Sequence, residues 1–150
     1  MSMFGGLEIS ASGLTAQRMR MDVTSENLAN AQTTKGADGQ PYRRKEVVLQ
    51  EIPGGNGGFG AQLSSAMGPS SSGPAGGVEV AQIATDPTPG KKTYDPGNPD
   101  ADKQGYVEMP NVDTVTEMVD LIDSSRAYDA NVTAMSATKQ MFSKTLDLLK

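Results

Sequence analysis

The stretch that decides the fold covers residues 111–149 and reads NVDTVTEMVDLIDSSRAYDANVTAMSATKQMFSKTLDLL. With Met118 at heptad position a, eight of the ten a and d positions are apolar. These eight are Met118, Leu121, Tyr128, Val132, Met135, Phe142, Leu146 and Leu149. Such a repeat is typical of a helix in a coiled coil or bundle. We predict a long helix that begins after Pro110, with Asn111 or Asp113 as its N-cap.

A second face of this helix carries small side chains, namely Ala127, Ala130, Ala134 and Ala137. The distance between packed helices depends on the side chains at their contact, so alanines allow a close approach. We expect the apolar seam to pair inside the subunit and the alanine face to contact a neighbouring subunit.

The N-terminal part of the chain has a matching pattern. Over residues 7–31, apolar residues recur every seven positions, at Leu7, Leu14, Met21 and Leu28. This spacing predicts a second amphipathic helix, which ends near residues 33–36, where two threonines and a glycine follow. We expect its stripe to pair with the C-terminal seam.

The middle of the chain contains short β-type runs separated by turns. Candidate strands lie within residues 42–52, at residues 78–83, and at the shorter segments 93–94 and 106–107. Residues 53–77 have the Gly, Ser and Pro composition of a linker. The predicted fold class is α+β, with helical segments at 1–35 and 110–150 paired as a coiled coil around a β-rich segment at 36–109.

Composition excludes several classes of function. The 150 residues carry 13 Lys and Arg against 18 Asp and Glu, and they include no His, Cys or Trp. The commonest general base and the thiolate nucleophile are therefore missing. A net charge of −5 argues against nucleic acid and anionic membranes as partners. We expect no enzyme activity, no cofactor, no metal, no membrane span and no cleaved signal peptide.

Two short motifs resemble ligand-binding sequences but lack the context that binding requires. Residues 55–60 satisfy G-x-G-x-x-G, but Pro69 and a serine run prevent the helix that a dinucleotide site requires. Asn98, Asp100 and Asp102 alternate as in an EF-hand loop, but the sixth position is Lys103 instead of Gly. We interpret the first motif as a loop and the second as a turn solvated by carboxylates.

Several longer motifs carry a resemblance to a known family. They are SENLANA (25–31), GQPYRRK (39–45), GVEV (77–80), YDPGNP (94–99), MPNV (109–112) and SRAYDAN (125–131). In this order they resemble the flagellar basal-body rod proteins. The matching motif residues include Asn27, Asn30, Asn111, Arg126 and Asn131.

The resemblance implies a structural subunit of the proximal rod. Such subunits self-assemble with other axial proteins into a tubular drive shaft that transmits torque and conducts exported subunits. The implied partners are other rod proteins, the adaptor that joins rod to membrane ring, and the flagellar type III export apparatus. The implied location is the periplasmic rod of the basal body, reached without a cleaved signal peptide.

Some alternatives remain open at this point. Without the resemblance, a cytosolic coiled-coil adaptor or a homo-oligomer fits the same pattern. Asn27 and Asn30 suit either helix C-capping or a hydrogen bond between subunits. The basic cluster at residues 43–45 suits either a solvated strand start or ion pairs with acids on a neighbouring subunit.

Overall fold

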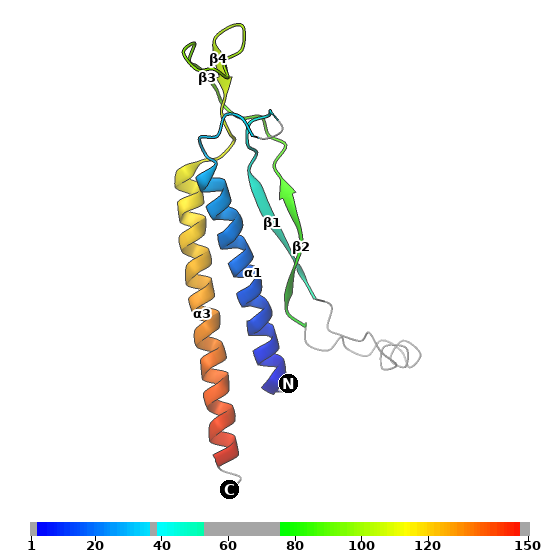
Figure 1. The fold of residues 1–150 in the computed structure, drawn as a ribbon. Helices are drawn as coiled ribbons and strands as arrows, with labels where there is room; N and C mark the ends of the chain where they lie inside the picture. Colours follow the sequence, from blue (N-terminus) through cyan, green and yellow to red (C-terminus); the bar gives the residue numbers. More distant parts are fainter. Residues whose placement is uncertain (1–2, 37–38, 53–75, 148–150) are drawn as a thin grey trace, which may run out of the picture. The chain divides into compact units, whose positions relative to one another are not determined.

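The computed structural model describes residues 3–36, 39–52 and 76–147 (Figure 1). Long helices lie near both ends of the chain and short strands lie between them, so the predicted α+β class is confirmed. The elements are α1 (Met3–Ala29), β1 (Lys45–Glu51), β2 (Val78–Thr85), β3 (Lys92–Tyr94), β4 (Tyr106–Glu108) and α3 (Thr114–Asp147). No helix in these described ranges is long and apolar enough to cross a membrane.

The chain divides into two compact units, each of which takes part of α1 and part of α3. Unit 1 combines Met1–Gln17, Leu49–Ala81 and Ala127–Lys150, and unit 2 combines Arg18–Val48 and Gln82–Arg126. Most of the predicted linker, and with it the G-x-G-x-x-G motif, falls outside the described residues.

The predicted strands form two small antiparallel sheets, β1 with β2 and β3 with β4. In unit 1, the Ile52 N–H donates to the Gly77 carbonyl at 3.0 Å, and in unit 2 the Asp86 N–H donates to the Arg44 carbonyl at 2.8 Å. These two bonds run in the order expected for antiparallel β1 and β2. In the second sheet, Thr93 of β3 lies opposite Val107 of β4.

The ends of the helices are fixed by side chains. Asp113 is the N-cap of α3, because its Oδ1 accepts hydrogen bonds from the Val115 and Thr116 N–H groups at 2.9 and 3.4 Å. The alternative cap, Asn111, instead accepts from the Arg44 N–H at 2.7 Å. Helix α1 ends at Ala29, and the Asn30 side chain donates to the Glu26 carbonyl of its last turn at 2.9 Å.

Few apolar side chains are fully buried. Among the described residues, the buried hydrophobic ones are Ala16, Val23 and Val107. The N-terminal stripe of Leu7, Leu14, Met21 and Leu28 is half-buried throughout. Unit 2 has a mainly polar interior, because Thr24, Asn27, Glu117 and Ser124 are all buried there.

We expected the apolar seam of α3 to be buried within the chain, but the chain covers it only in part. Leu121, Tyr128 and Phe142 are half-buried, and Leu149 lies outside the described residues. Met118, Val132, Met135 and Leu146 are exposed. The buried positions are Glu117 and Ser124, each one residue before a predicted a or d position. Pairing of the two helices as a regular coiled coil therefore remains a prediction.

In unit 2 there is a physical reason why the buried face of α3 carries Glu117 instead of the predicted apolar seam. Glu117 and Asp120 both bind Arg44, so the first turns of α3 present their acidic face inward. A buried carboxylate without a partner costs more free energy than leaving several apolar side chains partly exposed.

The N-cap gives the first testable prediction. Asp113→Ala should lower the free energy of unfolding by about 0.5–2 kcal/mol, because two N–H groups of the first turn lose their acceptor. Urea denaturation followed by circular dichroism measures this change. The control is Asp123→Ala, which removes an exposed carboxylate from the interior of the same helix. An equal effect of both variants would contradict the capping role.

Candidate functional site

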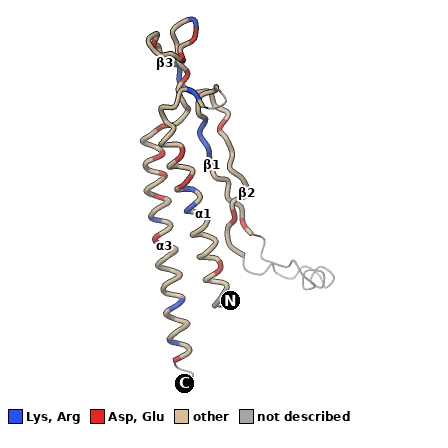
Figure 2. Tube along the Cα trace, in the orientation of Figure 1, with Lys and Arg blue, Asp and Glu red and all other residues tan. Residues whose placement is uncertain are grey.

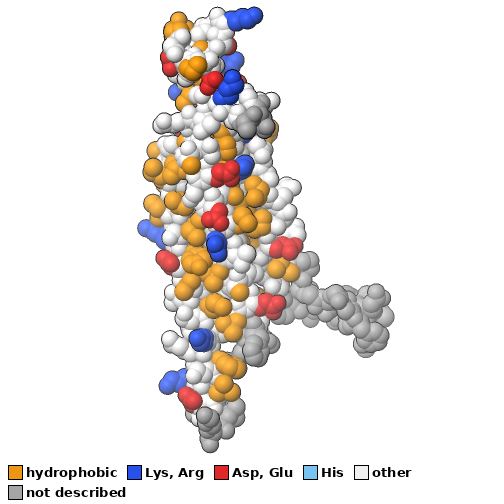
Figure 3. Space-filling view, in the orientation of Figure 1, with side chains coloured by type: hydrophobic (Ala, Val, Ile, Leu, Met, Phe, Trp, Pro, Cys, Tyr) orange, Lys and Arg blue, Asp and Glu red, His pale blue; other side chains and the backbone are white. Residues whose placement is uncertain are grey.

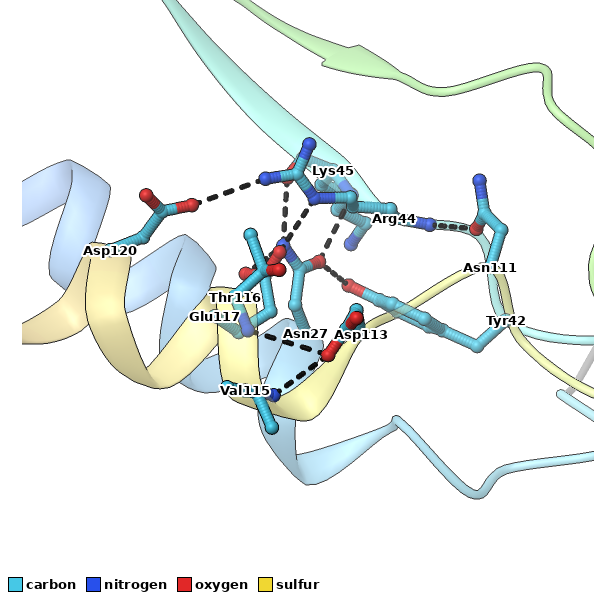
Figure 4. A network of polar contacts seen from close by, with 10 residues as sticks. All are labelled: Asn27, Tyr42, Arg44, Lys45, Asn111, Asp113, Val115, Thr116, Glu117 and Asp120. Atoms are coloured by element: carbon cyan, nitrogen blue, oxygen red, sulfur yellow. Dashed lines mark hydrogen bonds and ion pairs between the residues drawn. The ribbon is translucent and has the colours of Figure 1, made fainter.

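The central polar contact of unit 2 is the side chain of Asn27, in the last turn of α1 and only 1% exposed. Its Nδ2 donates to the Lys45 carbonyl at 2.8 Å and to Glu117 Oε2 at 2.9 Å. Its Oδ1 accepts from the Tyr42 hydroxyl at 2.8 Å and from the Lys45 N–H at 2.9 Å. These bonds, drawn in Figure 4, use the whole hydrogen-bonding capacity of an amide side chain.

Glu117 lies beside this amide in the first turn of α3 and is 1% exposed. Its second oxygen, Oε1, accepts from Arg44 Nε at 2.6 Å, while Arg44 Nη2 pairs with Asp120 at 3.3 Å (Figure 4). The hydrogen bond that Arg44 donates to Glu117 raises the pKa of Arg44 above its usual value, against the opposing effect of burial. The buried carboxylate is thus compensated by a guanidinium and an amide.

Tyr42 completes the cluster from the segment before β1. Burial raises its pKa to about 12, and the nearby carboxylates of Glu26 and Glu117 add to the shift. The ammonium of Lys45 pairs with Glu26 and also lies 5.7 Å from the centre of the Tyr42 ring.

We call these residues the Asn27 network, meaning Asn27, Tyr42, Arg44, Lys45, Asn111, Glu117 and Asp120. The network joins three segments that are far apart in the sequence, namely the end of α1, the start of β1 and the first turns of α3. Apart from the buried Asn111 Nδ2, which has no hydrogen-bond partner in the described structure, its polar groups mainly bind one another and the backbone, so the network holds backbone segments together. The arrangement suits a structural role.

Several site residues from the sequence have defined positions. Asn27 is neither a C-cap nor exposed to another subunit, whereas Asn30 is the cap of α1. In unit 1, Asn131 of α3 lies against Gly13 of α1, where an added Cβ would be 3.1 Å from the Asn131 Nδ2. Arg126 is exposed on α3.

Within the basic cluster, Arg43 is exposed just before β1, as expected for a solvated strand start, whereas Arg44 and Lys45 have a different role. Arg44 and Lys45 pair with acids of the same chain, Glu117, Asp120 and Glu26. Sequence reasoning missed Glu117 as a partner, because an acid in a first turn is already explained by the helix dipole. In the sequence, Glu117 directly precedes Met118, which is an apolar position of the heptad, and this position was the available signal.

The EF-hand-like segment is a turn, as interpreted. The Asn98 Oδ1 accepts from the Asp100 N–H, and the Asp102 Oδ1 accepts from the Gln104 and Tyr106 N–H groups. These backbone bonds hold the pKa of Asp102 below its usual value. Within the described residues, no group of three or more Asp or Glu side chains is positioned to hold a metal ion.

Comparison with known families matches both ends of the chain. The family described as "Flagella basal body rod protein" matches residues 7–37, which include most of α1. The family described as "Flagellar basal body rod FlgEFG protein C-terminal" matches residues 103–148, which include α3. The matched segments thus contain Asn27, Asn111, Glu117 and Asp120. These two matches place the chain in the class of flagellar rod proteins.

Individual relatives give the narrower assignment. The flagellar basal-body rod protein FlgC of Bacillus subtilis (strain 168) is 52% identical over 155 aligned residues, with full coverage of both chains. FlgC of Yersinia enterocolitica is 45% identical, covering 99% of this chain and 98% of the relative. FlgC of Borreliella burgdorferi is 42% identical, with 100% and 99% coverage. The chain belongs to the FlgC family of flagellar basal-body rod proteins.

The Asn27 amide gives a second prediction. Asn27→Asp should lower the free energy of unfolding by about 2–4 kcal/mol, because a carboxylate cannot donate to the Lys45 carbonyl or to Glu117. Urea denaturation at neutral pH measures this loss. Asn30→Asp is the matched control, since it makes the same chemical change but removes a single hydrogen bond to the Glu26 carbonyl. Similar losses in the two variants would contradict the central position of Asn27.

Tyr42 gives a prediction about pH. Its folded-state pKa is about 12, above the unfolded value of 10.0, so the folded chain binds more protons between these values. Its contribution to stability is therefore fully present below about pH 10 and is lost as the pH rises towards about 12.

The measurement follows tyrosinate absorption and the free energy of unfolding across this range. One of the four tyrosines should ionise later than the others, and Tyr42→Phe should remove that late component. If the late component persists in Tyr42→Phe, the assignment is wrong.

Proposed function

We propose that this chain is a structural subunit of the proximal rod of the flagellar basal body, where it self-assembles with other axial proteins into a tubular drive shaft. The observation that carries the proposal is the full-length similarity to FlgC proteins, at 52% identity in one case. The relatives are named as rod proteins, which favours a structural role over catalysis and over a cytosolic adaptor.

The surface of α3 supports assembly. Large apolar side chains remain exposed along it, including Met118, Val132, Met141 and Leu146. Extended apolar patches on a protein surface commonly mark sites of contact with other proteins. In this proposal, the helical segments 1–35 and 110–150 make contacts between subunits, and the segment 36–109 forms the outer part. The apolar seam, the alanine face and the motif residues are then interface or positioning residues.

The wider setting is also part of the proposal. The subunit contacts other rod proteins and the adaptor that joins the rod to the membrane ring. It reaches the periplasmic rod through the flagellar type III export apparatus, without a cleaved signal peptide. The absence of cysteine suits a chain that crosses the export channel unfolded, because no disulfide can form before assembly.

The test uses cells in which the gene for this chain is deleted and replaced by variants. Val132 is 40% exposed in the single chain, so Val132→Asp should leave the folded chain intact but prevent rod assembly. Swimming in soft agar and the recovery of rods in isolated basal bodies measure the result. Val132→Leu keeps the apolar surface and should restore swimming. Full motility of Val132→Asp would contradict the interface role, and full motility of the deletion strain would contradict the proposed function.

A further inference from the structure

A small, partly open cavity lies beside the Asn27 network in unit 2. Its volume is about 50 Å³, and its lining comes from the second half of α1, the start of β1 and the first turns of α3. Thr24, Arg44 and Asp120 are among the lining residues. A water molecule needs roughly 10–15 Å³ of such space, so the cavity has room for at least one.

The lining of this cavity is polar, and its charges are balanced. Three of its side chains are cationic and three are acidic, namely Arg20, Arg44, Lys45, Glu46, Glu117 and Asp120. Figure 2 shows both signs of charge along these segments. In contrast, large hydrophobic side chains are exposed on the outside of α3 in this unit (Figure 3). Cavities that stay empty in proteins are apolar, and a balanced set of charges has no net attraction for an ion, so the lining fits water.

Thr24 provides a hydroxyl group at this cavity and is only 8% exposed. In other threonines of the helices, such as Thr15 and Thr133, the hydroxyl donates to the carbonyl four residues earlier, at 3.1 and 2.9 Å. The Thr24 hydroxyl makes no hydrogen bond to any residue that the structure describes. Because a buried hydroxyl without a hydrogen bond is costly, we expect it to bind a molecule from the solvent.

Arg44 and Asp120 have unused hydrogen-bonding groups at the same cavity. Arg44 donates from Nε to Glu117 and from Nη2 to Asp120, so its Nη1 has no partner in the described part of the chain. Asp120 accepts through Oδ2, and its Oδ1 has no partner among the same residues. A guanidinium has only donors and a carboxylate has only acceptors, so one water molecule can accept from the first and donate to the second.

We propose that an ordered water molecule occupies this cavity, where it accepts a hydrogen bond from Arg44, donates one to Asp120 and bonds to the Thr24 hydroxyl. Buried waters typically make about three hydrogen bonds, which is the number of partners here. The water joins α1, the start of β1 and α3, the same three segments that Asn27 joins. This site belongs to the folded single chain and does not depend on the proposed function.

A crystal structure of the full-length chain, at a resolution that shows ordered water, tests the site directly. We expect a water peak within hydrogen-bond distance of Thr24 Oγ1, Arg44 Nη1 and Asp120 Oδ1. A well-defined cavity without this peak would overturn the proposal. A buffer ion at this position, or a water that contacts neither Thr24 nor Arg44, would overturn it as well.

Variants of Thr24 test the site in solution. Thr24→Val keeps the shape of the side chain but removes the hydroxyl, so it should raise the equilibrium constant of unfolding by roughly threefold to tenfold, the effect of one hydrogen bond. Oxygen-17 relaxation dispersion should count one long-lived water fewer in this variant. Thr24→Ser keeps the hydroxyl and should retain the full count. In a dry cavity, Thr24→Val would be neutral or stabilising, because it removes an unpaired hydroxyl.

Thr133→Val is the matched control. Thr133 is exposed on α3, and its hydroxyl donates to a carbonyl of its own helix, so this variant should leave the count of long-lived waters unchanged. An unchanged count in Thr24→Val, or an equal decrease in Thr133→Val, would overturn the proposal. If Thr24→Val does not fold, the crystal structure of the natural chain decides the outcome alone.

Discussion

The structure of unit 2 depends on one buried amide. Asn27 uses both of its hydrogens and both acceptor positions of its oxygen inside the chain. Two of these bonds go to the backbone of Lys45 and one goes to a buried carboxylate, so helix α1 cannot rotate without breaking several of them. In a low-dielectric interior, each such loss leaves an unsatisfied polar group, which makes this geometry more specific than apolar contact alone.

This constraint explains why the interior of unit 2 is polar and the outside of α3 is apolar. Glu117 must face Asn27 and Arg44, and on a helix this choice fixes the direction of every neighbouring residue. Val115, Met118, Val119 and Ile122 are then directed away from the Glu117 face. These apolar side chains are therefore exposed in the single chain, and the proposed function assigns them to contacts with other chains.

Much of the fold was predictable from local chemistry. The two helices, the strands and the Asp113 cap follow from heptad spacing, alternation and the preference of Asp for helix starts. The Asn27 network was not predictable, because it depends on three segments that meet only in the folded chain. Heptad spacing ranks faces by hydrophobicity, so it selected Met118 over Glu117. Glu117 is buried in place of Met118 because its carboxylate accepts hydrogen bonds from Asn27 and Arg44.

The two kinds of contact also differ in when they form. The Asn27 network lies within one chain, so its stability does not depend on protein concentration. In the proposed rod, other chains cover the apolar faces of α3, so the contribution of these faces to stability grows with the number of assembled neighbours. A chain built in this way keeps a specific local structure around Asn27 while it is alone. In the proposed assembly, other chains cover its exposed apolar side chains, which adds a stabilising contribution that a single copy lacks.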